Sequence, residues 1–165
     1  MNLFEAIRSR RSIRAFSDKP LERQLLERIV DAGRFAATAR NVQPWEFVVV
    51  SERGMLKSLA ALADNGRFIA DAAACIAVFC SDTKYYLEDG CAATQNMLLA
   101  AGGLGIGSCW VAGDKKSYCN QVSALLAAPA SLKLVSLIAL GYPQDANIPN
   151  PQKRNLSEVI HLERF

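Results

Sequence analysis

The chain has 165 residues, a formal net charge of +3 at neutral pH, and a composition that is 51% hydrophobic and 21% charged. This length and composition are typical of one α/β or α+β domain with a large core, and they exclude a disordered or fibrous chain. The excess positive charge is concentrated at residues 8–14, so it predicts a local anion site and no nucleic-acid surface. The five cysteines include no C-x-x-C pair and predict no metal site. Together with a first segment that lacks the apolar stretch of a secretion signal, they indicate a cytoplasmic protein.

Apolar periodicity divides the chain into alternating helices and strands. Leu25, Ile29 and Ala32 recur every three or four residues, as on the buried face of a helix, and Pro20 suits its first position because no N–H partner is needed there. Pro44 blocks a helix, and the β-branched run after it is typical of a buried strand. In chain order, the patterns predict a short N-terminal helix, a helix over 21–35, a strand over 47–50, a helix over 53–63, a strand over 75–80, a helix over 86–101, a strand over 108–112, a helix over 114–127 and a strand over 132–141.

Residues 90–113 raise the alternative of a membrane span. This stretch has 24 positions without a charged residue, which is long enough to cross a bilayer as a helix. Polar side chains interrupt it, however, and the glycines of its second half would destabilise a helix there. The sequence therefore favours a buried helix, a glycine turn and a buried strand, and predicts no membrane partner.

The character of the sequence changes at Tyr142. Pro143, Pro149 and Pro151 exclude both a helix and a central strand in the segment that follows. The apolar residues of the final "RNLSEVIHLERF" need a surface to cover them, and a partner subunit provides one. We therefore expect a core over residues 1–141 and, over 142–165, an extended arm that docks on the partner subunit of an obligate homodimer.

The sequence carries no motif for acid–base catalysis by side chains. It lacks G-x-S-x-G and a Walker lysine, and its single histidine, His161, belongs to the arm, where a structural role is expected. The glycines of "GGLGIG" follow a helix and precede a strand, the reverse of the dinucleotide fingerprint. An arginine cluster without side-chain catalysts indicates that a phosphorylated cofactor supplies the chemistry.

Five segments occur in order along the chain: "RRSIRAF", "AATARNVQPWEFVVV", "AATQNMLLAAGGLGIGSCWV", "ALGYP" and "RNLSEVIHLERF". Together, from about residue 4 to the C-terminus, they resemble the FMN-dependent nitroreductase family. The resemblance implies an α+β fold with a mixed, mostly antiparallel sheet flanked by helices, built as an intertwined homodimer with an exchanged C-terminal arm and FMN sites at the interface. It also implies an NAD(P)H-dependent oxidoreductase: NADH or NADPH reduces FMN, and a nitroaromatic, a quinone or a similar electron-poor small molecule is then reduced in a ping-pong cycle.

The resemblance assigns the arginine cluster to the cofactor. It implies that Arg10, with Arg11 beside it, reaches the FMN phosphate, and that Ser12 bonds either the flavin or the phosphate. Arg14 would lie at the N1–C2 edge of the flavin, where a fixed guanidinium stabilises the anionic reduced form. The anion that these arginines face would therefore be FMN itself.

The resemblance also places cofactor contacts in four other segments. It implies that the N–H of either Ala112 or Gly113 bonds flavin N5, and that Lys153 replaces a basic residue of the family at the position of Gln152. Asn96 either faces the cofactor or completes a buried helix face. The remaining implied contacts are Ala37, Thr38, Ala39 and Asn41, on the FMN of the other subunit; Trp110 and Val111, along the flavin ring; and Arg154, at the phosphate.

Two alternatives stay open at the level of sequence. Tyr85 and Tyr86 open the helix over 86–101, where they either gate a substrate or pack against the core. The chain is also short for the family, which leaves little cover over the ring. A flavin-binding or flavin-handling protein without rapid NAD(P)H turnover is therefore the alternative function.

Overall fold

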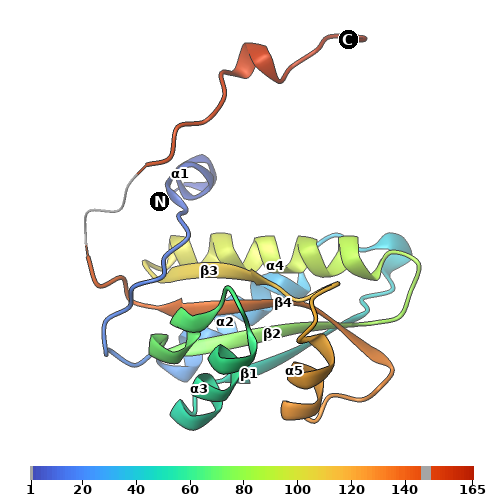
Figure 1. Ribbon diagram of the computed structural model, residues 1–165. Helices are drawn as coiled ribbons and strands as arrows, with labels where there is room; N and C mark the ends of the chain where they lie inside the picture. Colours follow the sequence, from blue (N-terminus) through green and yellow to red (C-terminus); the bar gives the residue numbers. More distant parts are fainter. Residues whose placement is uncertain (1, 146–149) are drawn as a thin grey trace.

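The computed structural model describes residues 2–145 and 150–165. Four strands form one sheet in the order β1-β2-β4-β3, and every neighbouring pair is antiparallel. The strands are β1 Trp45–Val50, β2 Ala74–Ser81, β3 Gly107–Ala112 and β4 Leu132–Gly141 (Figure 1). The longest strands, β2 and β4, therefore occupy the centre of the sheet.

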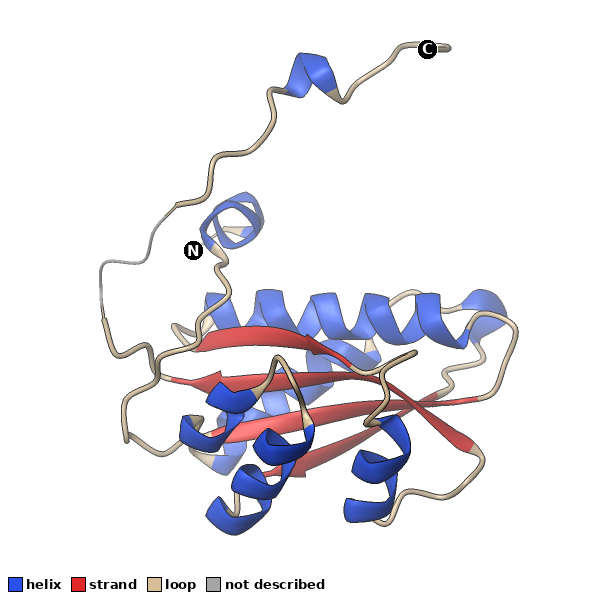
Figure 2. Cartoon of the chain, viewed as in Figure 1, coloured by secondary structure: helices blue, strands red, loops and turns tan. Residues whose placement is uncertain are grey.

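Helices cover both faces of this sheet (Figure 2). Side chains of α2 and α4 pack on one face, and those of α3, α5 and a short 3-10 helix, η2, pack on the other. The helices are α1 Leu3–Ser9, α2 Arg23–Arg34, α3 Arg53–Leu62, α4 Tyr86–Gly103 and α5 Cys119–Leu125, and the 3-10 helices are η1 Ala39–Asn41, η2 Arg67–Asp71 and η3 Leu156–Glu158. The result is a three-layer α+β fold.

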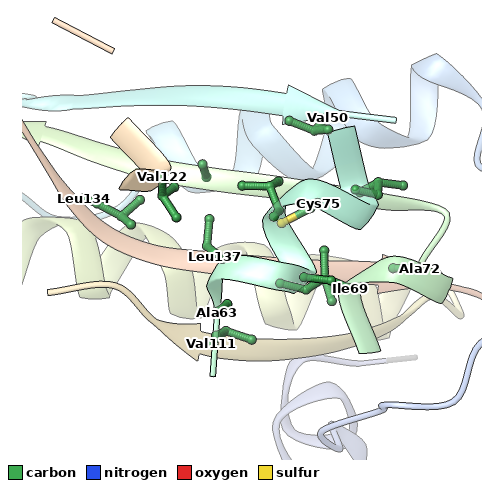
Figure 3. Packing of buried hydrophobic residues seen from close by; sticks show 14 of the residues in the cluster. Val50, Ala63, Ile69, Ala72, Cys75, Val111, Val122, Leu134 and Leu137 are labelled. Atoms are coloured by element: carbon green, nitrogen blue, oxygen red, sulfur yellow. The ribbon is translucent and has the colours of Figure 1, made fainter. Parts of the chain in front are cut away.

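The central strands explain the two-sided core. Successive residues of a strand point to opposite faces, so Ile76 and Ile138 pack against α2 and α4, whereas Cys75 and Leu137 face α3 and α5 (Figure 3). All four side chains are fully buried. Because both faces are covered, the central strands are apolar without alternation, as their sequences predict.

The structure confirms the predicted elements within a few residues, with two corrections. The second helix begins at Arg23, because Glu22 still has extended backbone angles, so Pro20 precedes the helix and does not open it. The predicted helix over 114–127 is wrong in its first five positions. There Lys115 has a φ of 59° and Asp114 donates its N–H to the Val135 carbonyl, so a turn replaces the expected helix until Cys119.

The uncharged stretch 90–113 folds as the sequence favours. It contributes most of α4, a turn at Gly105 with a φ of +74°, and strand β3. A side chain at that φ would be strained, so glycine suits this turn. Among the described residues, no helix is both long and apolar enough to span a membrane.

The segment after α1 pairs with the outer edge of β3 and with the residues that follow β4. The N–H of Ile13 donates to the Ser108 carbonyl at 2.9 Å, which pairs Ser12 and Ser108 in parallel at the outer edge of β3. Phe16 and Pro143 form an antiparallel bridge. The parallel pair is an isolated bridge outside the four strands, so the sheet itself is antiparallel and not mixed as predicted. The first residues after β4 remain bonded to their own core.

Candidate functional site

A cavity of about 1080 Å³ lies between the end of α1, the segment that follows it, helix α4 and the arm. It is lined by Ile7, Arg8, Arg10, Arg11, Ser12, Arg14, Gln95, Asn150, Pro151, Gln152 and Lys153. Five of these side chains are cationic, and none of these described lining residues is acidic. Because like charges this close repel one another, the cavity is suited to a multiply charged anion.

Local structure explains how the arginines reach this cavity. A capping box formed by Asn2 and Glu5 starts α1, and the chain becomes extended after that helix. Ile13 is buried against Gly107, where an added Cβ would lie only 2.9 Å from the isoleucine side chain. Alternation along this extended segment then turns the flanking residues, Ser12 and Arg14, outward.

The arginines have different surroundings. Arg11 donates to the carbonyls of Arg8 and Arg10 at 2.7 and 2.9 Å and also contacts the Asn150 side chain, so it braces the loop. The guanidinium of Arg14 lies 5.7 Å from the centre of the Phe68 ring on η2, within the range of a cation–π contact. Arg10 is half-buried. The structure therefore distinguishes side chains that the sequence pattern treats as one cluster.

The end of β3 presents a backbone donor on the outer edge of that strand. Gly113 donates its N–H to the Val135 carbonyl at 3.0 Å, so these two residues form a hydrogen-bonded pair. In an antiparallel ladder such pairs alternate, so the N–H and C=O of Ala112 point away from β4. Ala112 is also exposed, whereas Val111 and Gly113 are buried. Of the two N–H groups expected at flavin N5, that of Ala112 is the one directed outward.

This donor lies on the same strand edge that pairs with the arginine loop, the extended residues 10–14 after α1. Ser12 pairs with Ser108, and Ala112 lies four residues further along β3, a separation of about 13 Å. Cys109 lies between them with its thiol buried. Burial raises the pKa of Cys109 although Arg14 and Arg10 lower it, which favours the neutral thiol. The edge therefore suits an elongated ligand that carries an anionic group at one end and a hydrogen-bond acceptor at the other.

The structure places residues 37–41 elsewhere. Thr38 donates its hydroxyl to the Asp89 carboxylate at 2.8 Å, and the Ala39 N–H donates to the same carboxylate at 3.2 Å. Asp89 belongs to the first turn of α4, whereas Arg10 lies beside Gly102 in the last turn. Thirteen residues of helix separate the two, or about 20 Å. Within one chain, the predicted loop and the cavity are therefore not brought together.

Other predicted contacts also lie outside the cavity. Asn96 donates its side-chain amide to the Ala32 carbonyl of α2 at 3.2 Å, which matches the structural alternative for this residue. Arg154 contacts Glu158 within the arm, with a bond of 2.7 Å to its backbone carbonyl. Of the two predicted basic residues of the arm, only Lys153 lines the cavity.

The two tyrosines at the start of α4, Tyr85 and Tyr86, differ in how well their side chains are packed. The Tyr86 hydroxyl donates to Asp114 at 2.7 Å, and this bond raises the pKa of Tyr86 to about 12. Lys133 lies 4.6 Å from the centre of its ring. Tyr86 therefore packs against its neighbours, whereas Tyr85 is 43% exposed.

Sequence reasoning missed two residues beside the arginines. Gln95 lines the cavity, whereas the resemblance pointed to the adjacent Asn96, and Phe68 lies under Arg14. Gln95 was visible only as one of three consecutive polar residues in an apolar helix. Phe68 lies more than fifty residues from Arg14, so no local signal indicates their contact.

The fold and the cavity together define an α+β protein with a cluster of cationic side chains beside its sheet. The family model described as "Putative TM nitroreductase" matches residues 2–164. A "Putative NADH dehydrogenase/NAD(P)H nitroreductase" of Archaeoglobus fulgidus is 38% identical over 168 residues, which cover 96% of each chain. The chain belongs to the nitroreductase family.

Solved structures agree with this assignment. A Bacteroides thetaiotaomicron protein of the same description as the Archaeoglobus relative superposes with a TM-score of 0.93 at 30% identity, covering 99% of this chain and 98% of its own. A "putative nitroreductase in complex with fmn" from Desulfovibrio desulfuricans has a TM-score of 0.83 at 31% identity, covering 100% of this chain and 98% of its own. These comparisons confirm the family and the α+β fold that the sequence motifs indicate.

Proposed function

We propose that this protein is an FMN-dependent oxidoreductase that takes electrons from NADH or NADPH and delivers them to an electron-poor small molecule, such as a nitroaromatic or a quinone. The cavity carries this proposal, because its cationic side chains lie in line with an outward backbone N–H on the edge of β3. Two similarities support it: one relative is named as an NAD(P)H nitroreductase, and one similar structure is a complex with FMN.

The donor set of this chain fits FMN. Arg10 and Lys153 would hold the phosphate, since both line the cavity, and Arg11 would keep their loop in place. Arg14, on the same loop, would lie towards the pyrimidine edge, with the Ala112 N–H available to N5. Bound FMN supplies hydride acceptance and donation, and the protein contributes orientation and positive charge.

We further propose a homodimer in which both subunits complete each site. Two observations support it: residues 37–41 lie about 20 Å from the arginine loop along α4, too far to join the same site within one chain, and residues 150–165 are exposed throughout and extend away from the core (Figure 1). The exposed apolar side chains of this arm are Leu156, Val159, Ile160, Leu162 and Phe165. In the proposed dimer they are covered by the partner, and Thr38, Ala39 and Arg154 meet the cofactor across the interface. The division into core and arm, and the cytoplasmic location, stay predictions.

Anaerobic mixing of the FMN-loaded protein with NADH or NADPH tests the function. We expect the flavin absorbance near 450 nm to bleach within seconds and to return when a quinone is added. Bleaching that takes many minutes, with FMN still tightly bound, would instead support the flavin-handling alternative. A protein that binds no FMN at all would contradict both.

A further inference from the structure

Two side chains at the start of α5 hold the backbone that follows β3. The Tyr118 hydroxyl donates to the Ala112 carbonyl, and the Cys119 thiol donates to the Gly113 carbonyl. The two donors are consecutive residues at the start of α5. Val122 of the same helix is fully buried and anchors the helix in the core.

The same two peptide groups are also bonded on their other side. The N–H of Gly113 and the N–H of Asp114 donate to the Val135 carbonyl of β4, at 3.0 and 3.2 Å. The Ala112 carbonyl shares a peptide plane with the Gly113 N–H, and the Gly113 carbonyl shares the next plane with the Asp114 N–H. Each of these planes is therefore held at both its oxygen and its nitrogen.

Close packing removes the remaining freedom. A Cβ added at Gly113 would lie 2.7 Å from the Leu134 side chain and 2.9 Å from the Val135 carbonyl carbon, so the segment is pressed against β4. At the next residue, Tyr86 of α4 donates its hydroxyl to the Asp114 carboxylate at 2.7 Å. Ala112 is thus fixed by the β3–β4 ladder before it and by two bonded peptide planes after it.

We propose that Tyr118 and Cys119 are positioning residues that keep the Ala112 N–H aimed at the acceptor atom of a flat ring bound along the edge of β3. The inference rests on the proposed function, in which that acceptor is flavin N5. Both side chains bond carbonyls of this segment, so they act on the Ala112 N–H through the backbone. The geometry assigns catalytic orientation at this site to a tyrosine and a cysteine that carry out no chemistry themselves.

Four variants of the FMN-loaded protein test the proposal. Tyr118→Phe and Cys119→Ala each remove one donor and keep most of the packing, Cys119→Ser keeps a donor, and Tyr85→Phe is the matched control for loss of an exposed tyrosine hydroxyl. The measurements are the affinities for oxidised and for reduced FMN, and amide hydrogen exchange at Gly113 and Asp114.

Oxidised flavin accepts a hydrogen bond at N5, whereas N5 of the reduced flavin carries its own hydrogen. Tyr118→Phe and Cys119→Ala should therefore lower the affinity for oxidised FMN more than the affinity for reduced FMN. We expect the ratio of the two affinities to change by about threefold to tenfold, the latter equivalent to about 30 mV towards a more positive potential for a two-electron couple. Exchange at the two amides should accelerate about tenfold or more, whereas Cys119→Ser and Tyr85→Phe should resemble the unmodified protein.

An unchanged affinity ratio in both Tyr118→Phe and Cys119→Ala would overturn the proposal, even if their thermal stability fell, because a purely structural role lowers stability without discriminating between flavin states. Failure of the unmodified protein to bind FMN would overturn the proposed function instead. In that case the amide exchange of Tyr118→Phe still decides whether the hydroxyl holds the segment: exchange at the unmodified rate would contradict the inference. If Tyr118→Phe does not fold, Cys119→Ala against Cys119→Ser gives the same comparison.

Discussion

Strands β2 and β4 and the C-terminal arm both carry large apolar side chains, yet these side chains lie in opposite surroundings. Phe79 and Leu137 in the strands are fully buried between two helical layers, whereas Leu162 and Phe165 in the arm are 79% and 103% exposed. A strand gains burial from neighbours on both sides of the sheet, whereas residues 154–165 are exposed throughout. In the proposed dimer, the partner subunit would supply the cover that these apolar side chains lack.

The largest effect should come from a core side chain. Phe79→Ala leaves a cavity between the sheet and α3, and we expect the free energy of unfolding to fall by about 3–5 kcal/mol. Chemical denaturation measures this change. Phe165→Ala is the matched variant in the arm, and a comparable loss there would mean that the arm folds with the core and would break the comparison.

Removal of the arm should separate the two regions functionally. Deletion of residues 150–165 should leave the circular dichroism of the core intact but give a monomer. Because Lys153 leaves the cavity with the arm, FMN affinity should fall on the order of 100-fold, the scale for loss of a buried, charge-assisted contact.

Light scattering and flavin fluorescence quenching measure the two changes separately. A shortened chain that remains dimeric and fully loaded with FMN would show that the arm is dispensable for both. A chain that unfolds would show that the core is not complete without it.

The arginine loop, where the core meets the arm, should divide by role. Arg10→Ala should weaken FMN binding by about 2 kcal/mol and alter the reduction potential little, because both redox states carry the same phosphate. Arg14→Ala should retain most of the affinity for oxidised FMN and make the potential more negative by roughly 30 mV, or about 1.4 kcal/mol, since only the anionic reduced flavin loses its partner.

Dye-linked titration measures the reduction potential, and equilibrium binding measures the affinity for FMN. Arg23→Ala is the control for loss of a positive charge, because Arg23 is an exposed side chain of α2 that pairs with Glu27. Equal shifts of affinity and potential in Arg10→Ala and Arg14→Ala would show a diffuse positive field in place of separate roles.

The smallest effect should come from the loop at the far end of α4. Thr38→Val removes the hydroxyl that donates to Asp89, and we expect a loss of about 1–2 kcal/mol in the free energy of unfolding, because the carboxylate is buried and charged. Thr38→Ser keeps the donor and should remain within about 0.5 kcal/mol of the unmodified protein. If both variants behave alike, the hydroxyl does not anchor this loop.

The sequence alone determined the order and type of nearly every helix and strand. Apolar periodicity is a local property, and the buried runs of β2 and β4 or the repeated spacing of α2 are visible in short windows. It also determined the family, because five motifs that follow one another from about residue 4 to the C-terminus are specific in combination. The clustering of the arginines was visible too, because they are neighbours in the chain; that they bind an anion stays a prediction.

Tertiary structure decided whatever depended on a distant partner. Residues 114–118 form a turn because Gly113 and Asp114 bond Val135, which is more than twenty residues away. The register of β3 on β4 directs the Ala112 N–H outward and that of Gly113 towards β4. Likewise Thr38 is tied to Asp89, on the far end of α4 from the arginine loop. Hydrogen bonds between remote segments leave no periodic pattern in the sequence. Only the folded chain therefore shows which donors are already bonded and which are directed outward.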